Sequence, residues 1–212
     1  MPTTHLLYLH GFRSSPQSAK AQAMAAHVAQ HHPGVVWWCP QLPPSPRLAL
    51  QLIRQGTANW PQPAGPGQLP SGMSVMGSSL GGFYATVLAA SSGLFGGSIR
   101  SVLLNPAVHP ARDLQQHIGS HPVWQNPDEA VSFTADYIAE LQEMTPAAPL
   151  PEPMLAQCLA VVAVGDEVLD WREMAARYAR AAQLHILPGN DHALTDFEQS
   201  AMPLVLKFLQ LA

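Results

Sequence analysis

Short apolar runs recur along this chain, each set between turn residues or helical patterns. The strongest are HLLYLH (5–10), VVWWC (35–39), SVLLN (101–105) and CLAVVAV (158–164). Because these runs lack polar alternation, they predict strands buried on both faces, as in a parallel sheet. Two weaker runs, MSVMG (73–77) and QLHIL (183–187), raise the expected number of strands to about six.

Helical patterns separate these runs. Ser15 and Pro16 form a favourable N-cap and first-turn pair, so we expect a helix from there to about residue 31. A second helix, rich in small residues, is expected over residues 80–91.

Two later helix starts carry a capping-box signature. Asp170 with Glu173 predicts a helix that runs to about residue 182. Thr195 with Glu198 repeats the signature, and Pro203 then requires either a kinked helix or two short helices.

Strands and helices therefore alternate, which is typical of a doubly wound α/β fold with a mostly parallel sheet flanked by helices. In such a sheet, sites form in the crevice beyond the carboxyl ends of the strands. A chain of 212 residues with 47% apolar content fits a single domain over residues 1–212 with a sizeable core.

Residues 107–153 interrupt this alternation. A helix is expected over about residues 128–144, because apolar side chains from Phe133 to Leu141 recur there at helical spacing. We favour a helix packed on the sheet, and the alternative is a small substrate cap. Either arrangement is a small insert rather than a large lid.

Residues 77–81 read GSSLG, a G-x-S-x-G pattern centred on Ser79. The string alone is weak, but it lies directly after a predicted strand and directly before a predicted helix. A turn this tight strains the backbone and lifts the serine hydroxyl into the open. Gly77 and Gly81 lack side chains that would clash across the turn. We therefore predict Ser79 as a nucleophile rather than only a helix N-cap.

A serine nucleophile needs a general base and an orienting carboxylate. GDEVLDW follows the 158–164 strand and PGNDHAL follows the 183–187 strand, which gives the order Ser79, Asp166, His192 expected of α/β-hydrolases. Asp166 is preferred to Glu167 because it leaves the strand end first. Asp170 is explained by its capping box, and Asp191 lies too close in sequence to its neighbour His192.

Two backbone N–H groups are expected to face the serine. Leu80 starts the helix after the elbow, where a helix N-terminus stabilises developing negative charge. The HGF segment ends the first strand, and Gly11 permits a sharp turn that presents the N–H of Phe12. We predict Phe12 and Leu80 as oxyanion donors, with Gly11 as the fallback donor and His10 as a structural residue.

The composition limits the classes of partner and cofactor that this protein is expected to bind. The charged fraction is 11% and the formal net charge is -4, so no basic field is present that could bind nucleic acid. No run approaches the length of a membrane span, the N-terminus lacks the features of a signal peptide, and two isolated cysteines suit a reducing compartment, so we expect a cytoplasmic protein. The ten histidines form no metal-ligand pattern, and neither a metal nor a cofactor is expected.

Six segments of the chain resemble the YqiA/YcfP-like esterases, a bacterial family of compact α/β-hydrolases. They are LYLHGFRSSPQSAKA, PQLPPSP, GSSLGGFYAT, NPAVHP, GDEVLDWREM and GNDHALTDFE. The resemblance implies a cytoplasmic esterase that acts on acyl esters and on acyl-CoA thioesters, with the triad on Ser79, Asp166 and His192. The segment TANWPQPAGPGQLPSG departs from it.

The expected function is thus hydrolysis of small-molecule acyl esters or thioesters through an acyl-enzyme. Short or medium chains are favoured, unless Trp124, Phe133 and Tyr137 line a longer groove. A triad hydrolase of peptide or carbon–carbon bonds, and a binding protein that has kept the fold without the chemistry, are the alternatives.

Overall fold

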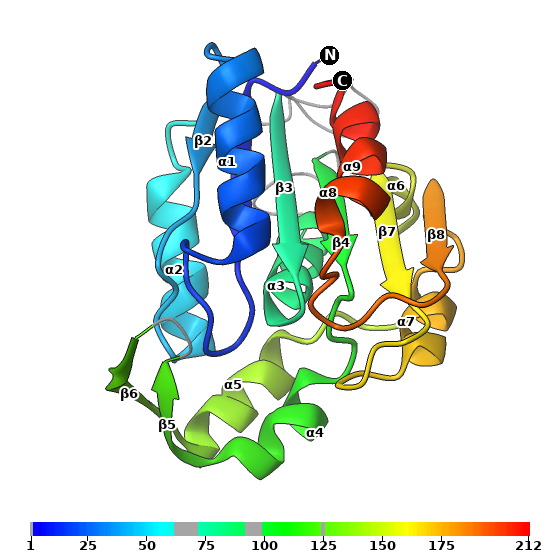
Figure 1. The fold of residues 1–212 in the computed structure, drawn as a ribbon. Coiled ribbons are helices and arrows are strands. Elements are labelled where there is room, and N and C mark those ends of the chain that lie inside the picture. The colour runs from blue at the N-terminus through cyan, green and yellow to red at the C-terminus, as the bar shows by residue number, and fades with distance from the viewer. Residues whose placement is uncertain (1, 62–71, 92–98, 124–125) are drawn as a thin grey trace.

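A single parallel sheet forms the centre of the molecule in a computed structural model (Figure 1). The structure describes residues 2–61, 72–91, 99–123 and 126–212, with 121–123 and 126–131 described by their backbone alone. The strand order is β2-β1-β3-β4-β7-β8, and every neighbouring pair is parallel. The prediction of about six mostly parallel strands is confirmed. The strands are β1 His5–Leu9, β2 Val36–Trp38, β3 Met73–Ser78, β4 Arg100–Leu104, β7 Cys158–Ala163 and β8 Gln183–Leu187.

Successive side chains of a strand point to opposite faces of the sheet, and a buried core lies on each face. On β1, Leu7 and Leu9 point into one core and Leu6 and Tyr8 into the other. The first core is covered by α2 Pro46–Gly56, α3 Leu80–Ala90 and α6 Glu152–Leu155, and α7 Trp171–Arg177 lies on the same side (Figure 1). The second is covered by α1 Ala19–His31, α8 Phe197–Ser200 and α9 Met202–Leu209.

Two of the predicted helix starts are wrong. The first helix begins at Ala19 after the N-cap Ser18, because the Ser15 hydroxyl accepts the N–H of Gln17 and closes a separate turn. Thr195 does not cap a helix, because its own N–H and hydroxyl donate to Asp191. The C-terminal segment consists of two short helices, one of the two expected forms.

The helix start predicted at Asp170 is confirmed, but the predicted capping box with Glu173 does not form. Asp170 caps α7 by accepting the N–H of Arg172. Glu173 instead pairs with Arg112, and the helix ends at Arg177 rather than near residue 182. The predicted partner of the box is therefore used for a tertiary contact.

Helix α2 has no counterpart among the predictions. Its start repeats the Ser-Pro signature of the N-terminal segment: the Ser45 hydroxyl accepts the N–H of Leu48, and Pro46 occupies the first turn. Ser45 and Pro46 end the proline-rich segment PQLPPSP, which as a whole is typical of a loop, so no helix was predicted there.

The insert lies beyond the carboxyl ends of the strands (Figure 1). Its elements are α4 Pro110–Leu114, the 3-10 turn Gln115–His117, the antiparallel pair β5 Gly119–Val123 and β6 Asn126–Phe133, and α5 Ala135–Met144. The helix predicted over 128–144 is therefore too long, because the backbone of its first part pairs with β5 and only the part after Thr134 is helical.

Polar side chains of α4 and α5 tie the insert to the rest of the molecule. The Glu140 carboxylate of α5 accepts the Ser45 hydroxyl at 2.8 Å and the Arg47 N–H at 2.9 Å, so it sits on the N-terminus of α2. Arg112 of α4 makes a bidentate pair with Glu173, at 2.8 and 2.7 Å. The insert is thereby held over the end of the sheet.

Candidate active site

Ser79 occupies the turn between β3 and α3. Its backbone has φ 56° and ψ −120°, a conformation that non-glycine residues rarely adopt. The turn is fixed from both sides: the Ser79 N–H donates to the carbonyl of Leu104, and the Ser79 carbonyl accepts the N–H of Ala107, each at 3.0 Å. The serine is therefore held by the segment that follows β4.

The elbow glycines are required by close backbone contacts. A Cβ on Gly77 would lie 2.1 Å from the Gly81 carbonyl oxygen, and a Cβ on Gly81 would lie 1.9 Å from that of Leu9. No side chain fits at such distances, and the obstructing atoms are backbone. The glycines let α3 start directly against the ends of β1 and β3.

His192 and Asp166 are joined by a short hydrogen bond. The Asp166 Oδ2 atom lies 2.7 Å from Nδ1 of His192, and the Asp166 side chain is 0% exposed against 19% for His192. Asp166 Oδ1 accepts the N–H groups of Val168 and Leu169, so the carboxylate is satisfied and fixed. Since a carboxylate can only accept, Nδ1 carries the proton and Nε2 is available for another partner.

The other carboxylates near this pair have different contacts. Glu167 accepts the backbone N–H of His192 at 3.0 Å rather than the imidazole. Asp191 is engaged by Thr195, whose hydrogen bonds lower the pKa of Asp191. Of the carboxylates weighed in the sequence, the structure therefore brings Asp166 to the His192 ring.

The turn after β1 approaches the serine closely. A Cβ added to Gly11 would lie 3.2 Å from Cβ and 3.7 Å from Oγ of Ser79. Phe12 and Leu80 both line the cavity that contains Ser79. As the first residue of α3, Leu80 has an N–H with no acceptor inside the helix.

His10 holds this turn in place. Its Nε2 accepts the N–H of Leu42 at 3.0 Å and its Nδ1 donates to the Gly11 carbonyl at 3.0 Å, which requires the neutral ring. Burial lowers the pKa of His10, although the bond to Gly11 opposes the shift. These contacts agree with a structural role for His10.

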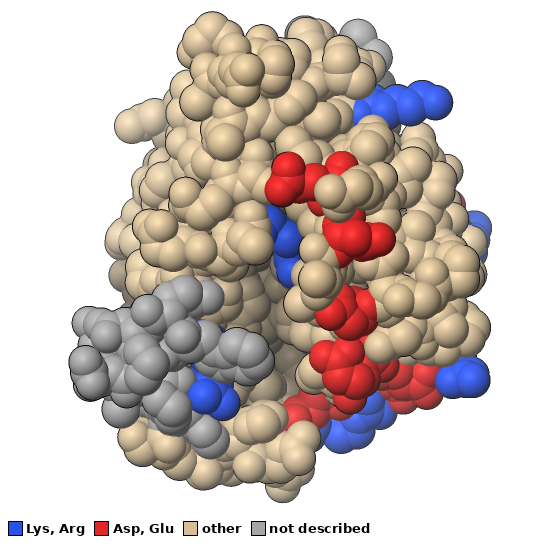
Figure 2. Space-filling view, in the orientation of Figure 1, with Lys and Arg blue, Asp and Glu red and all other residues tan. Residues whose placement is uncertain are grey.

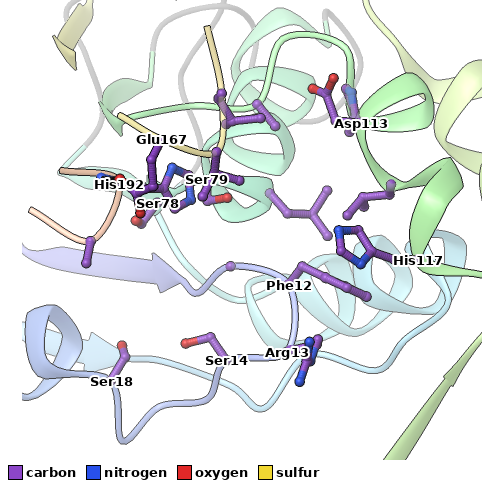
Figure 3. Close-up of a pocket in the computed structure, with 18 of the residues that line it drawn as sticks. Phe12, Arg13, Ser14, Ser18, Ser78, Ser79, Asp113, His117, Glu167 and His192 are labelled. Atoms are coloured by element: carbon purple, nitrogen blue, oxygen red, sulfur yellow. Dashed lines mark hydrogen bonds between the residues drawn. The ribbon is translucent and has the colours of Figure 1, made fainter. Parts of the chain in front are cut away.

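A cavity of about 480 Å³ opens over these residues, and Figure 3 shows Ser79 and His192 together on one side of it, with Phe12 and His117 farther along. Its lining has an apolar part and a polar part. The apolar part includes Phe12, Leu80, Ala107, Pro110, Leu114 and Leu169, and the polar part includes Arg13, Ser14, Ser18 and Lys20.

The surface is hollowed in this region, with basic side chains inside the hollow and acidic side chains along one lip (Figure 2). Lys20 of α1 lines the cavity and donates to the carbonyl of Ala193. Burial lowers the pKa of Lys20, and the charge of Asp191 opposes that shift.

Two of the three aromatic residues considered for a longer groove, Phe133 and Tyr137, lie outside the cavity. Phe133 is buried behind Phe12, with ring centroids 5.1 Å apart in an edge-on arrangement, and Tyr137 packs on Phe133. Neither residue lines the cavity as it stands. Trp124 is outside the described residues, as is most of the segment that departs from the family resemblance.

Within the described residues, no three His, Cys, Asp or Glu side chains are grouped so that they could hold a metal ion. Cys39 and Cys158 are both free thiols. None of the helices in the described ranges has the length and apolar character that a bilayer crossing requires.

The sequence from residue 5 to residue 210 matches the model of a family described as "Uncharacterised protein family (UPF0227)". The chain belongs to UPF0227. This is the family of the YqiA/YcfP-like esterases, so the resemblance found in the sequence is confirmed.

Solved structures place this UPF0227 chain in the α/β-hydrolase fold. Est1E from Butyrivibrio proteoclasticus, solved with ferulic acid, matches with a TM-score of 0.66 and 15% identity over 99% of this chain and 87% of its own. Mouse alpha/beta hydrolase domain-containing protein 10 matches with a TM-score of 0.67 and 13% identity, over 98% and 92% of the two chains. The α/β-hydrolase fold predicted from the sequence is confirmed.

The structure also reveals residues near the site to which the sequence assigned no role. Asn105 follows β4 and contacts the His192 loop, Lys20 reaches that loop from α1, and Pro110 and Leu114 bring α4 to the cavity. Asn105 was detectable as a polar residue directly after a buried strand. The other contacts depend on how distant elements meet.

Proposed function

We propose that this protein is a serine esterase that hydrolyses small acyl esters through a Ser79, His192 and Asp166 triad. The observation that carries the proposal is the His192 imidazole, which is bound through Nδ1 to a buried Asp166 and shares one cavity with the strained Ser79. Nucleophile, base and orienting acid follow three separate strands of one sheet, in the chain order typical of α/β-hydrolases.

In the proposed reaction, Nε2 of His192 takes the proton of the Ser79 hydroxyl as its oxygen attacks the ester carbonyl. The N–H groups of Phe12 and Leu80 stabilise the oxyanion, and His192 then protonates the departing alcohol. A water molecule activated by His192 attacks the acyl-enzyme, releases the carboxylic acid and restores Ser79. Asp166 keeps the proton on Nδ1 throughout, so that Nε2 faces the reaction. The chemistry uses no metal or cofactor.

We propose that the insert acts as a small substrate cap. Three of its residues line the cavity: Pro110 and Leu114 of α4, and His117 of the following turn. The Phe12 ring lines the apolar part of the cavity and packs on the buried Phe133, and this limit favours short or medium acyl chains. The same attack on a thioester carbonyl would extend the activity to acyl-CoA, which is the substrate class implied by the family resemblance.

The test is hydrolysis of p-nitrophenyl esters from two to sixteen carbons, with an acyl-CoA measured alongside. We expect turnover of the short esters by the wild type and a loss of about 10⁴-fold or more in Ser79→Ala. Ser78→Ala is the matched control, because Ser78 also lines the cavity and precedes the elbow position. Equal activity in Ser79→Ala and wild type would overturn the proposal.

A hydrolase of peptide or carbon–carbon bonds would use the same triad, since the fold does not choose the leaving group. A peptide panel and a β-diketone substrate, run beside the esters, distinguish these activities. A protein that only binds its ligand would turn over none of the panels.

A further inference from the structure

The end of β4 and the residues that follow it contact the turns that carry all three proposed triad residues. As described above, Leu104 and Ala107 hold the backbone of Ser79 on both sides. Between them lies Asn105, which is 0% exposed and has a backbone φ of 40°. Asn105 is thus a buried, polar residue in the left-handed region, one position after Leu104 and two before Ala107.

Both ends of the Asn105 side chain are used, and each reaches a different strand-end loop. Its Nδ2 donates to the carbonyls of Asp191 and His192, each at 3.1 Å. Its Oδ1 accepts the N–H of Ala163, the last residue of β7, at 2.8 Å. The Asp166 N–H in turn donates to the carbonyl of Ala163, so this residue connects Asn105 to the turn that carries Asp166.

Side chains from three separate segments hydrogen-bond to the backbone of the loop that carries His192. Asn105 binds two of its carbonyls, Glu167 accepts the His192 N–H, and Lys20 donates to the carbonyl of Ala193. Glu167 is exposed and Lys20 is half-buried, whereas Asn105 is fully buried. A buried hydrogen bond with no water to replace it holds geometry more firmly than an exposed one.

We propose that Asn105 is a positioning residue for ester hydrolysis, which sets the place of His192 relative to Ser79 and Asp166 through its side-chain carboxamide. This inference rests on the proposed function. Asn105 touches no reacting atom and acts through the loop that carries the base. Asn105 follows β4 and hydrogen-bonds to the end of β7 and to the His192 loop that follows β8. It therefore fixes the positions of these three segments relative to one another.

A glycine substitution distinguishes a role of the Asn105 side chain from a role of its backbone conformation alone. Asparagine is one of the few non-glycine residues that tolerate a left-handed φ, and glycine tolerates it better. Asn105→Gly therefore keeps the backbone conformation and removes only the carboxamide. Asn105→Asp keeps the shape and the acceptor for Ala163, but places a carboxylate oxygen against the carbonyls of Asp191 and His192.

The experiment compares kcat and KM for p-nitrophenyl acetate in the wild type, Asn105→Gly and Asn105→Asp. We expect kcat to fall about 100-fold in both variants, because a misplacement of about 1 Å has an effect of that size, while KM stays within about twofold. Tyr178→Phe is the matched control: it removes a buried hydrogen bond to Thr86, at 2.8 Å, and Tyr178 does not line the cavity. It should keep the wild-type kcat.

A second readout needs no substrate. The Nδ1 proton of His192, hydrogen bonded to Asp166, should give a far-downfield proton NMR signal in the wild type that is shifted or lost in Asn105→Gly and unchanged in Tyr178→Phe. If the wild type hydrolyses no ester but the signal responds in this way, the esterase proposal fails and the positioning role stands.

Conversely, ester hydrolysis by Asn105→Gly within threefold of wild type, with an unchanged NMR signal, would overturn the positioning role and leave the esterase proposal intact. If Asn105→Gly does not fold, Asn105→Asp carries the same two measurements, with the same expected results and the same contradicting ones.

Discussion

The cavity is built by two regions that are held in different ways. The strand-end turns that carry Ser79, Asp166 and His192 are fixed by buried backbone and side-chain hydrogen bonds. The insert that covers them packs Phe133 and Leu141 into the main core, and its polar links to α2 and α7 are ion pairs, several of them exposed. Exposed ion pairs contribute about 0–1 kcal/mol each, so these polar links are weaker than the buried hydrogen bonds of the strand ends.

The difference predicts a division of roles. Changes at the strand ends should act on the chemical step and lower kcat. Changes in the insert should act on the space that the substrate occupies, and appear in KM and chain-length preference. Phe12 belongs to both regions, since its N–H is a proposed oxyanion donor and its ring packs on Phe133.

The largest effect is expected for Asp166→Asn. Removing the carboxylate that holds Nδ1–H leaves His192 without its correct tautomer, so kcat for p-nitrophenyl acetate should fall about 10⁴-fold. Glu167→Gln is the matched control, because its amide oxygen can still accept the His192 N–H. That control should stay within about tenfold of wild type. Equal losses in the two variants would contradict the assignment of Asp166 as the orienting acid.

Phe12→Ala should change selectivity. The Phe12 ring lines the cavity and packs on Phe133, so its removal should enlarge the apolar part of the cavity while the backbone N–H stays in place. We expect the ratio of kcat/KM for the octanoate over the acetate ester to rise about tenfold, consistent with a gain of about 1–3 kcal/mol in apolar contact. An unchanged ratio would show that the ring does not limit chain length.

Glu140→Gln should loosen the insert. The Glu140 side chain is 12% exposed and accepts two hydrogen bonds at the N-terminus of α2. Loss of the charge there should raise KM two- to threefold and lower the free energy of unfolding by about 1–2 kcal/mol, measured by urea denaturation. Glu143→Gln is the control on the same helix, since Glu143 is 68% exposed, and its effect should be within about 0.5 kcal/mol. Similar effects for the two glutamates would argue against a specific attachment at Glu140.

The smallest expected effect is on the pH dependence of the free energy of unfolding, through His10. The pKa of His10 is lowered in the folded protein, so the unfolded chain binds a proton first as the pH falls through about 6.5. The free energy of unfolding should therefore decrease from pH 7.5 to pH 5.5 more in the wild type than in His10→Gln. Parallel pH curves for the two proteins would show that His10 is not held neutral by its contacts.

Much of the fold follows from local sequence because the central strands are buried on both faces, and each of them is then a mostly apolar run. The elbow is detectable because a strand, a glycine-flanked serine and a helix are adjacent in the chain. Asp166 and His192 follow because strand ends of a parallel sheet meet at one edge.

What sequence reasoning missed depends on long-range contacts. The later part of β6 lies within the helix predicted over 128–144, and its backbone pairs with β5 instead. Glu173 has the right spacing for a capping box but pairs with Arg112, which is 61 residues away. Asn105 reaches carbonyls 86 and 87 residues away, a contact that no local pattern encodes.

The most direct test of the account is covalent labelling with a fluorophosphonate, followed by peptide mapping. The account predicts one adduct, on Ser79, in the wild type and in Ser78→Ala, and no adduct in Ser79→Ala. It also predicts much slower labelling in His192→Ala, because the hydroxyl then lacks its base. Labelling on another residue, or undiminished labelling of Ser79→Ala, would contradict it.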